Sequence, residues 1–221
     1  MSTTQRYTNF KLYGYGLSSN TWRVRIALSA KEIPYESLST DSLEMNRIGP
    51  ILEFVDTDDQ NKVVQLKQSL AIIEFLECAF PNQGGQLLPI DPVMRAKVKE
   101  VVEAIDLKKQ PLQNYAVVEI IDVETGAVEK KTLSTKSIEN GICITLESML
   151  APYHSSSDNT SSSGPFALGT DSPTLADVYI IPQLHNAKHL FGVDDSAYPT
   201  LLKIERACKD HPWFVGTLPD H

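Results

Sequence analysis

The pattern of apolar residues changes at residues 81–92, and this change constrains the fold more than any other feature of the sequence. Before it, short runs of β-branched and aromatic residues alternate with helical patterns; after it, long helical patterns follow one another. The segment itself contains prolines and glycines, which interrupt regular structure. We therefore expect two domains, an α/β domain over residues 1–83 and an all-helical domain over residues 92–221.

The opening of the chain predicts a strand, a helix and a second strand. Phe10–Tyr15 is a short aromatic run typical of a strand, and Ser18–Thr21 is a polar group that precedes the helical pattern Trp22–Leu28. Pro34–Ser39 has the composition of a second strand. A strand–helix–strand unit of this length predicts two parallel strands.

The remainder of the first half predicts a hairpin followed by a helix. Ile51–Val55 and Val63–Leu66 are apolar runs separated by residues that favour turns, as in an antiparallel pair. Gln68 and Ser69 then open a segment with apolar residues at three- and four-residue spacing up to Phe80. The resulting order of elements is thioredoxin-like.

The second half is predicted to be helical. Long amphipathic patterns run over residues 93–118 and 134–150, and a shorter one over residues 200–209. Thr174 and Asp177 have the spacing of a capping box at the start of a further, strongly apolar helix.

Composition excludes several classes of function. A net charge of −8, with no Lys- or Arg-rich run, argues against binding to nucleic acid. No apolar run approaches the ~20 residues needed to span a membrane, and the N-terminus lacks the apolar stretch of a signal peptide. A cytoplasmic location is therefore expected.

The cysteines predict neither a disulfide framework nor a metal centre. Cys78, Cys143 and Cys208 are scattered and odd in number, and no C-x-x-C motif or His/Cys cluster occurs. We therefore expect no metal cofactor.

One motif carries a resemblance to a known family. Residues 18–28, Ser-Ser-Asn-Thr-Trp-Arg-Val-Arg-Ile-Ala-Leu, resemble the signature Ser-Ser-Cys-x-Trp-Arg-Val-Arg-Ile-Ala-Leu of zeta-class glutathione transferases. Segments 68–77, 110–114 and 174–183 resemble the same family in the same order. The resemblance implies a thioredoxin-like domain followed by an all-α domain, glutathione as cofactor, a homodimer, and an activity like that of maleylacetoacetate isomerase, which belongs to this class.

The chemistry expected at Ser18 is stabilisation of a thiolate. A free thiol has a pKa near ~8.5, so a protein that uses glutathione as a nucleophile must favour its anion. A helix N-terminus offers unpaired N–H groups and a partial positive charge, and a serine hydroxyl adds a hydrogen bond. Two alternatives stay open: the residues at 18–21 form an ordinary cap, or Tyr15 is the thiolate donor and Ser18 is not. For Tyr15 we favour simple packing in the strand.

The resemblance assigns catalytic roles to Ser18 and Ser19 and a wider set to glutathione binding. Pro50 matches a cis-proline whose preceding residue pairs with the cofactor backbone, and Gln68 and Ser69 match the residues that hold its γ-glutamyl end. For Gln110 and Asn114 a solvated helix face is an equal alternative. The full glutathione-binding set is Ser18, Ser19, Asn20, Gly49, Pro50, Gln68, Ser69, Gln110 and Asn114.

Two departures from the family pattern concern the nucleophile region and the substrate. Asn20 stands where the signature has cysteine, so this position supplies no thiol. His189 stands where the family usually has an arginine for a substrate carboxylate, with Lys188 beside it. A histidine is only partly charged at neutral pH and lacks the bidentate fork of arginine. We expect His189 and Lys188 to bind substrate.

The function expected from this resemblance is glutathione-dependent cis–trans isomerisation of a conjugated enone acid through reversible thiolate addition. The substrate would be a small unsaturated carbonyl compound similar to maleylacetoacetate, or an analogue from a specialised pathway. The alternatives are a transferase that performs conjugation or dehalogenation, and a transferase-like binding protein without catalysis.

Overall fold

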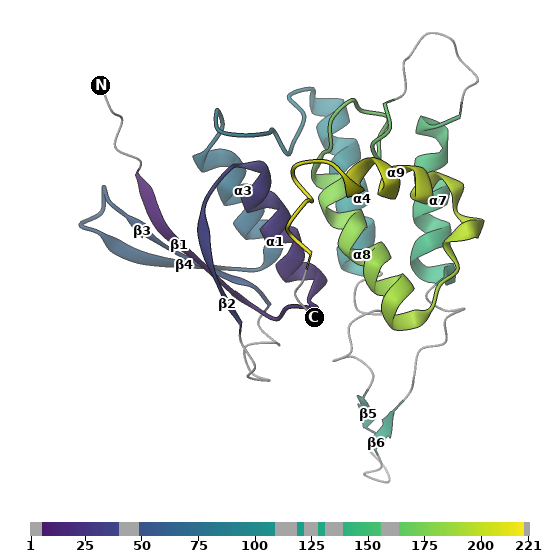
Figure 1. Cartoon of the computed structure of the whole chain (residues 1–221), viewed down its shortest axis with the longest axis horizontal. Helices are drawn as coiled ribbons and strands as arrows, with labels where there is room; N and C mark the ends of the chain where they lie inside the picture. The colour runs from purple at the N-terminus through teal and green to yellow at the C-terminus, as the bar shows by residue number, and fades with distance from the viewer. Residues whose placement is uncertain are drawn as a thin grey trace. The chain divides into compact units, whose positions relative to one another are not determined.

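The computed structural model describes residues 6–39, 49–108, 119–121, 128–130, 139–155 and 164–218 (Figure 1). The chain divides into two compact units. One comprises Met1–Leu87 together with His211–His221, and the other comprises Leu88–Asp210. The predicted assignment of the last residues to the helical domain is therefore wrong.

The first unit is built on a four-stranded sheet. Its strands are β1 (Tyr7–Gly14), β2 (Tyr35–Ser39), β3 (Ile51–Asp56) and β4 (Lys62–Lys67), in the spatial order β2-β1-β3-β4. β1 and β2 are parallel, whereas β3 is antiparallel to both β1 and β4. The helices α1 (Ser19–Ala30) and α3 (Ser69–Ala79) pack against each other beside the sheet (Figure 1). This order confirms the predicted thioredoxin-like arrangement.

The core of this unit is made by alternate strand residues and one face of each helix. Leu12 and Leu52 are fully buried in the sheet, and Ile26 and Ile72 are fully buried in α1 and α3. Each such side chain stabilises the fold by about 1.5–3 kcal/mol relative to an exposed position.

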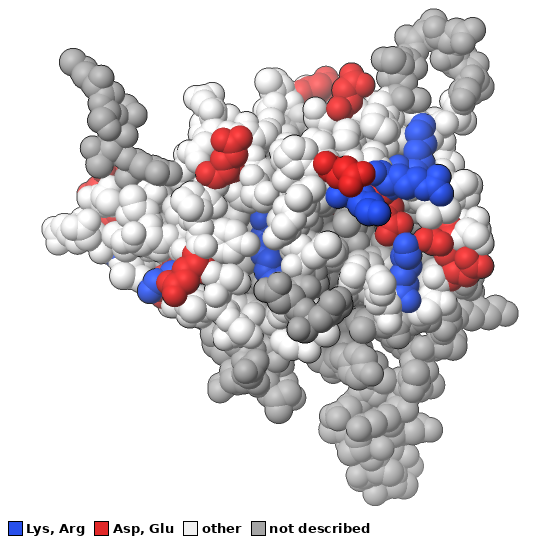
Figure 2. All heavy atoms as spheres, in the orientation of Figure 1, with Lys and Arg blue, Asp and Glu red and all other residues white. Residues whose placement is uncertain are grey.

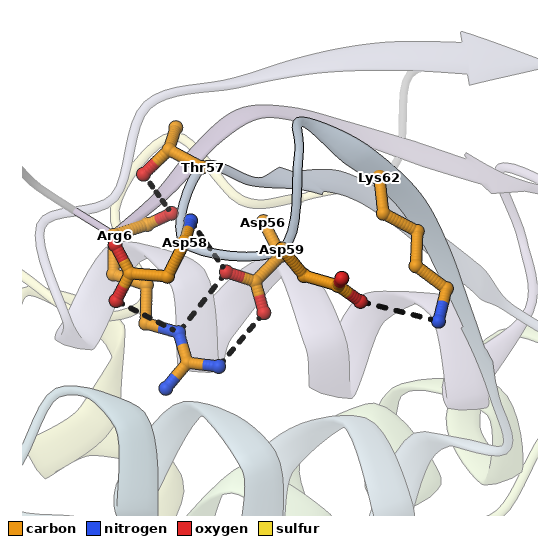
Figure 3. A network of polar contacts seen from close by, with 6 residues as sticks. All are labelled: Arg6, Asp56, Thr57, Asp58, Asp59 and Lys62. Atoms are coloured by element: carbon orange, nitrogen blue, oxygen red, sulfur yellow. Dashed lines mark hydrogen bonds and ion pairs between the residues drawn. The ribbon is translucent and has the colours of Figure 1, made fainter.

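A network of polar contacts closes the β3–β4 hairpin and fixes the start of β1 (Figure 3). The Arg6 guanidinium makes two hydrogen bonds to the Asp56 carboxylate, at 3.0 and 2.9 Å. The Asp58 backbone N–H donates to the same carboxylate at 3.1 Å, and Lys62 pairs with Asp59 at 3.3 Å. Arg6 holds the pKa of Asp56 below its ordinary value through these hydrogen bonds. Because Arg6 is half exposed, the ion pair adds little to stability, and its main effect is to hold the start of β1 beside the end of β3.

The C-terminal segment His211–Leu218 belongs to the first unit because its side chains contact α1 and the loop after α3. The Trp22 indole N–H donates to Thr217 Oγ1 at 3.0 Å in a buried hydrogen bond. A Cβ atom on Gly85 would overlap the Trp213 ring, so only glycine permits this packing.

The second unit is mainly helical. Its principal helices pack as the pairs α4 with α8, α7 with α9, and α8 with α9. They are α4 (Pro92–Lys108), α7 (Ile144–Leu150), α8 (Leu175–Phe191) and α9 (Pro199–Lys209), with short helical turns at η2 (Glu139–Cys143), η3 (Ala151–Tyr153) and η4 (Asp195–Ala197). Acidic and basic side chains lie intermixed over the region of α8 and α9 (Figure 2). In the parts of the chain that the structure describes, no helix is long and apolar enough to cross a membrane.

The prediction of an entirely helical second half needs one correction. A short antiparallel pair is present, formed by β5 (Glu119–Ile121) and β6 (Val128–Lys130). Its strands carry the β-branched residues Ile120, Ile121 and Val128, which favour extended backbone. These short strands lie between the stronger helical patterns of residues 93–118 and 134–150, which dominate the periodicity of this part of the sequence.

The predicted capping box at the start of α8 is confirmed. The Thr174 side chain accepts from the Ala176 N–H at 3.2 Å, and Asp177 accepts from the Thr174 N–H at 2.8 Å. The other Asp177 oxygen accepts from the Ala167 N–H at 2.8 Å. Complete burial raises the pKa of Asp177 to about 6.

Candidate active site

The topology of the sheet brings three predicted glutathione-binding segments to one end of the first unit. Tyr13 of β1 pairs with Ile51 of β3, and Ile51 pairs with Lys67 of β4. These three residues form one row across the sheet. α1 follows the end of β1 in this row, β3 begins in it, and α3 follows the end of β4 in it. Ser18, Pro50 and Ser69 therefore all lie in connections at the same end of the sheet.

Ser18 is the N-cap of α1. Its backbone is extended, with φ −70° and ψ 118°, and its carbonyl accepts the first helical hydrogen bond, from the Trp22 N–H at 2.9 Å. Its hydroxyl oxygen accepts from the Thr21 N–H at a long 3.4 Å. A bond of this length is weak, and no acidic residue occupies the first turn of α1. No carboxylate in the first turn of α1 therefore offsets the partial positive charge of the helix N-terminus, which favours an anion.

The N-terminus of α3 is also free of an acidic residue, and it lacks a side-chain cap. Gln68 precedes the helix with φ 71° and ψ 126°, a conformation that non-glycine residues rarely adopt. The Gln68 side chain does not cap the helix, and the first turn contains no acidic residue. Ser69 is 6% exposed and Gln68 is exposed. Strained backbone of this kind persists where the surrounding structure requires it, often at a ligand site.

The connection into β3 differs from the prediction. The structure has a trans bond between Gly49 and Pro50, since none of the described peptide bonds is cis. The chain turns into β3 through Gly49, which has φ 80°, in the region that glycine adopts without a steric penalty. Pro50 is buried at the start of the strand. The prediction of a cis bond before Pro50, which came from the family pattern, is therefore wrong.

Two contacts that the sequence did not predict hold the loop before Ser18. A Cβ atom on Gly14 would lie 2.5 Å from both Thr21 Oγ1 and Thr21 Cγ2, so the absence of a side chain lets the first turn of α1 approach β1. The Arg25 guanidinium donates to the Gly16 carbonyl at 3.3 Å. Gly14 could have been noticed as a glycine at a strand end, whereas the partner of Arg25 has no sequence signal.

The neighbours of Ser18 have different surroundings. Ser19 is 2% exposed, and the Asn20 side-chain oxygen accepts from Arg23 at 3.0 Å. Asn20 thus supports the first turn of α1. Tyr15 lies beyond the end of β1 and is 43% exposed, so the expectation that it packs within the strand is wrong.

The predicted substrate residues lie near the C-terminal end of α8 in the second unit. His189 is exposed, and its ring contacts that of His185 with centroids 4.1 Å apart. Lys188 pairs with Asp195 at 2.7 Å and with Glu205 at 3.0 Å, so its charge is already balanced. Gln110 and Asn114 fall outside the described residues.

Comparison with known proteins places this arrangement in a family. The chain is 36% identical to maleylacetoacetate isomerase of Rattus norvegicus over 203 residues, which are 89% of this chain and 86% of that protein. It is 32% identical to a zeta-class glutathione S-transferase of Euphorbia esula over 220 residues, with 95% and 90% of the two chains covered. The chain belongs to the zeta-class glutathione transferase family. A comparison with protein-family models gives no match.

A solved zeta-class relative agrees in fold as well as in sequence. Maleylacetoacetate isomerase from Anaeromyxobacter dehalogenans, crystallised with dicarboxyethyl glutathione and citrate in its active site, has a TM-score of 0.78 and 31% identity. The match covers 98% of this chain and 93% of the other. The chain therefore has the zeta-class architecture, an α/β thioredoxin-like domain followed by a helical domain.

Proposed function

We propose that this protein is a glutathione-dependent cis–trans isomerase acting on a small conjugated enone acid. The observation that carries the proposal is the position of Ser18 at the N-terminus of α1, at the same end of the sheet as the start of α3. Relatives that match over most of the chain are maleylacetoacetate isomerases, which supports this choice of reaction.

The charge distribution in glutathione fits the described ends of the two helices. Glutathione has a thiol, two carboxylates and an amine, so it needs a site for a thiolate and a separate site for a carboxylate. α1 and α3 each begin without an acidic residue in the first turn, so neither helix end repels an anion. Ser69, buried at the first position of α3, and Gln68, held at φ 71°, would bind the γ-glutamyl end.

Ser18 would hold the sulfur of the cofactor as its anion. Its hydroxyl makes only the long 3.4 Å contact to Thr21, so it is able to turn and donate to sulfur. Each favourable contact with the thiolate is worth on the order of 1 kcal/mol, and two or three of them would lower the thiol pKa by one to two units. When bound, glutathione would supply the nucleophile that adds reversibly to the conjugated double bond and so permits rotation.

Other parts of the proposal rest on the family pattern. Ser19, Asn20, Gly49 and Pro50 would complete the site in the first unit. Gln110 and Asn114 would also bind glutathione, and His189 would bind a substrate carboxylate. We also propose a cytoplasmic homodimer. Lys188 is less suited to bind substrate than the sequence alone suggested, because two carboxylates already pair with its ammonium group.

The test is turnover of maleylacetone with and without glutathione. We expect isomerisation that requires glutathione and falls by about 10²-fold or more in Ser18→Ala. Ser172→Ala, at an exposed position in the second unit, is the matched control and should keep full activity. Turnover without glutathione, or full activity in Ser18→Ala, would contradict the proposal.

Conjugation is the second candidate, because the same activated thiolate attacks other electrophiles. Mass spectrometry of the product separates the two reactions. An isomerase returns glutathione unchanged, whereas a conjugating enzyme leaves it covalently attached to the product.

A further inference from the structure

Two histidines stand one helical turn apart near the end of α8. His185 and His189 have i, i+4 spacing, which places both side chains on one face of the helix. Their ring centroids are 4.1 Å apart and the ring planes are inclined by 40°. His189 is exposed and His185 is half-buried, so the pair is open to solvent on one side.

We propose that His185 and His189 form a chelating site for a divalent transition-metal ion of the zinc, nickel or copper type. Neutral imidazole is a preferred ligand of these ions, and an imidazole commonly binds an ion through one nitrogen while the other donates a hydrogen bond. Nitrogens that share an ion at about 2.0–2.1 Å must lie within about 4 Å of each other. The ring centroids are 4.1 Å apart, so the proposal requires only that the two side chains rotate until one nitrogen of each ring faces the same ion.

The electrostatic surroundings favour a cation. The pair lies in the last two turns of α8, which ends at Gly192 in the left-handed conformation with φ 64°. The C-terminal end of a helix carries a partial negative charge that attracts cations. The ammonium group nearest in sequence, on Lys188, is neutralised by Asp195 and Glu205, which reduces its repulsion toward a metal at the pair.

The site would be a two-residue chelate. No group of three or more His, Cys, Asp and Glu residues suited to a metal ion occurs within the described residues. Two protein ligands leave the remaining coordination positions to water or to a small anionic ligand. The prediction of no metal cofactor concerned cysteine-based centres, whereas this site uses two histidines. Metal binding here is separate from the binding of glutathione in the first unit.

Calorimetric titration with zinc chloride and with copper chloride tests the site. The full chain is used in a non-coordinating buffer at mildly alkaline pH, where imidazole is neutral. We expect one ion per chain, with copper bound more tightly than zinc. His185→Ala and His189→Ala should each weaken binding by about tenfold or more, because either change leaves a single ligand. His221→Ala removes an imidazole that is not part of α8 and should bind as the unchanged protein does.

Thermal unfolding gives a second measurement that also checks folding. In a chelating buffer each variant should unfold in a single cooperative transition, and the temperature of that transition is the variant's own reference. Added zinc should raise that temperature in the unchanged protein and in His221→Ala, and not in the two α8 variants. The proposal is overturned if the α8 variants bind zinc and copper as tightly as the unchanged chain, or if the unchanged chain binds neither ion at millimolar concentration.

Discussion

Lys31 Nζ lies 2.6 Å from Glu77 Oε2 in the interior of the first unit, where the two side chains are 1% and 9% exposed. Lys31 also donates to the Phe80 carbonyl at 3.2 Å, and Glu77 accepts from the Leu87 N–H at 3.2 Å. The pair thus connects the end of α1 to α3 and to the chain that leaves it. Because α1 and α3 both begin at the candidate glutathione site, this buried pair fixes the two helices on which the site depends.

Removing one member of the Lys31–Glu77 pair should be strongly destabilising. Lys31→Met leaves the Glu77 carboxylate buried without its cation, and we expect a loss of about 3–5 kcal/mol in the free energy of unfolding. Chemical denaturation measures this change. Lys62→Met breaks the exposed pair with Asp59 and serves as control, with an expected loss of at most about 1 kcal/mol. Equal losses in the two variants would contradict the account.

Asp177→Asn should destabilise the second unit. Both oxygens of the carboxylate accept backbone N–H groups, from Ala167 and Thr174, and an amide offers only one acceptor oxygen. We expect a loss of about 1–3 kcal/mol in the free energy of unfolding, measured by denaturation. An unchanged unfolding midpoint would show that the capping box contributes little.

The stability difference between the unchanged protein and Asp177→Asn should depend on pH. Burial raises the pKa of Asp177 from 3.8 to about 6, so ionising the carboxyl costs the native state free energy. The Asp177 carboxyl group makes its full contribution to the free energy of unfolding below about pH 4, where it is protonated in both states. That contribution is lost as the pH rises through about 6, and the total loss is about 3 kcal/mol. The deficit of the variant should therefore be larger at pH 4 than at pH 7. A deficit that grows with pH would contradict the raised pKa.

The three cysteines should differ sharply in reactivity. Cys78 is exposed, whereas Cys143 and Cys208 are buried. Burial, together with Asp177 at 3.9 Å, also raises the pKa of the Cys208 thiol well above its ordinary value. We expect a thiol reagent to modify one group quickly in the native protein, and Cys78→Ser to abolish that phase. A fast phase that survives in Cys78→Ser would show that a buried cysteine becomes accessible.

The elements that the sequence predicted well are those with local signals. The cap at Ser18, the capping box of Thr174 and Asp177, and the hairpin from Ile51 to Leu66 each depend on residues close together in the chain. The two caps form hydrogen bonds within a few residues, and the hairpin pairs two strands that a single turn joins, so local residue types predict all three.

The features that the sequence did not predict depend on distant residues or on backbone geometry. The Trp22–Thr217 hydrogen bond joins residues that are 195 positions apart in the sequence, and it binds the C-terminal segment to α1 in the first unit. The trans bond before Pro50 accompanies a positive φ at Gly49, which no residue pattern specifies. For the candidate site, the sequence identified Ser18 and Ser69, but the shared end of the sheet follows only from strand order and register.

The most direct test of the central claim is the pKa of glutathione bound to the protein, measured from the ultraviolet absorbance of the thiolate across a pH series. We predict a pKa about one to two units below the ~8.5 of a free thiol, and a return toward that value in Ser18→Ala. Ser172→Ala should leave the lowered pKa unchanged. A bound thiol with an ordinary pKa in the unchanged protein, or the same lowered pKa in Ser18→Ala, would contradict the role assigned to Ser18.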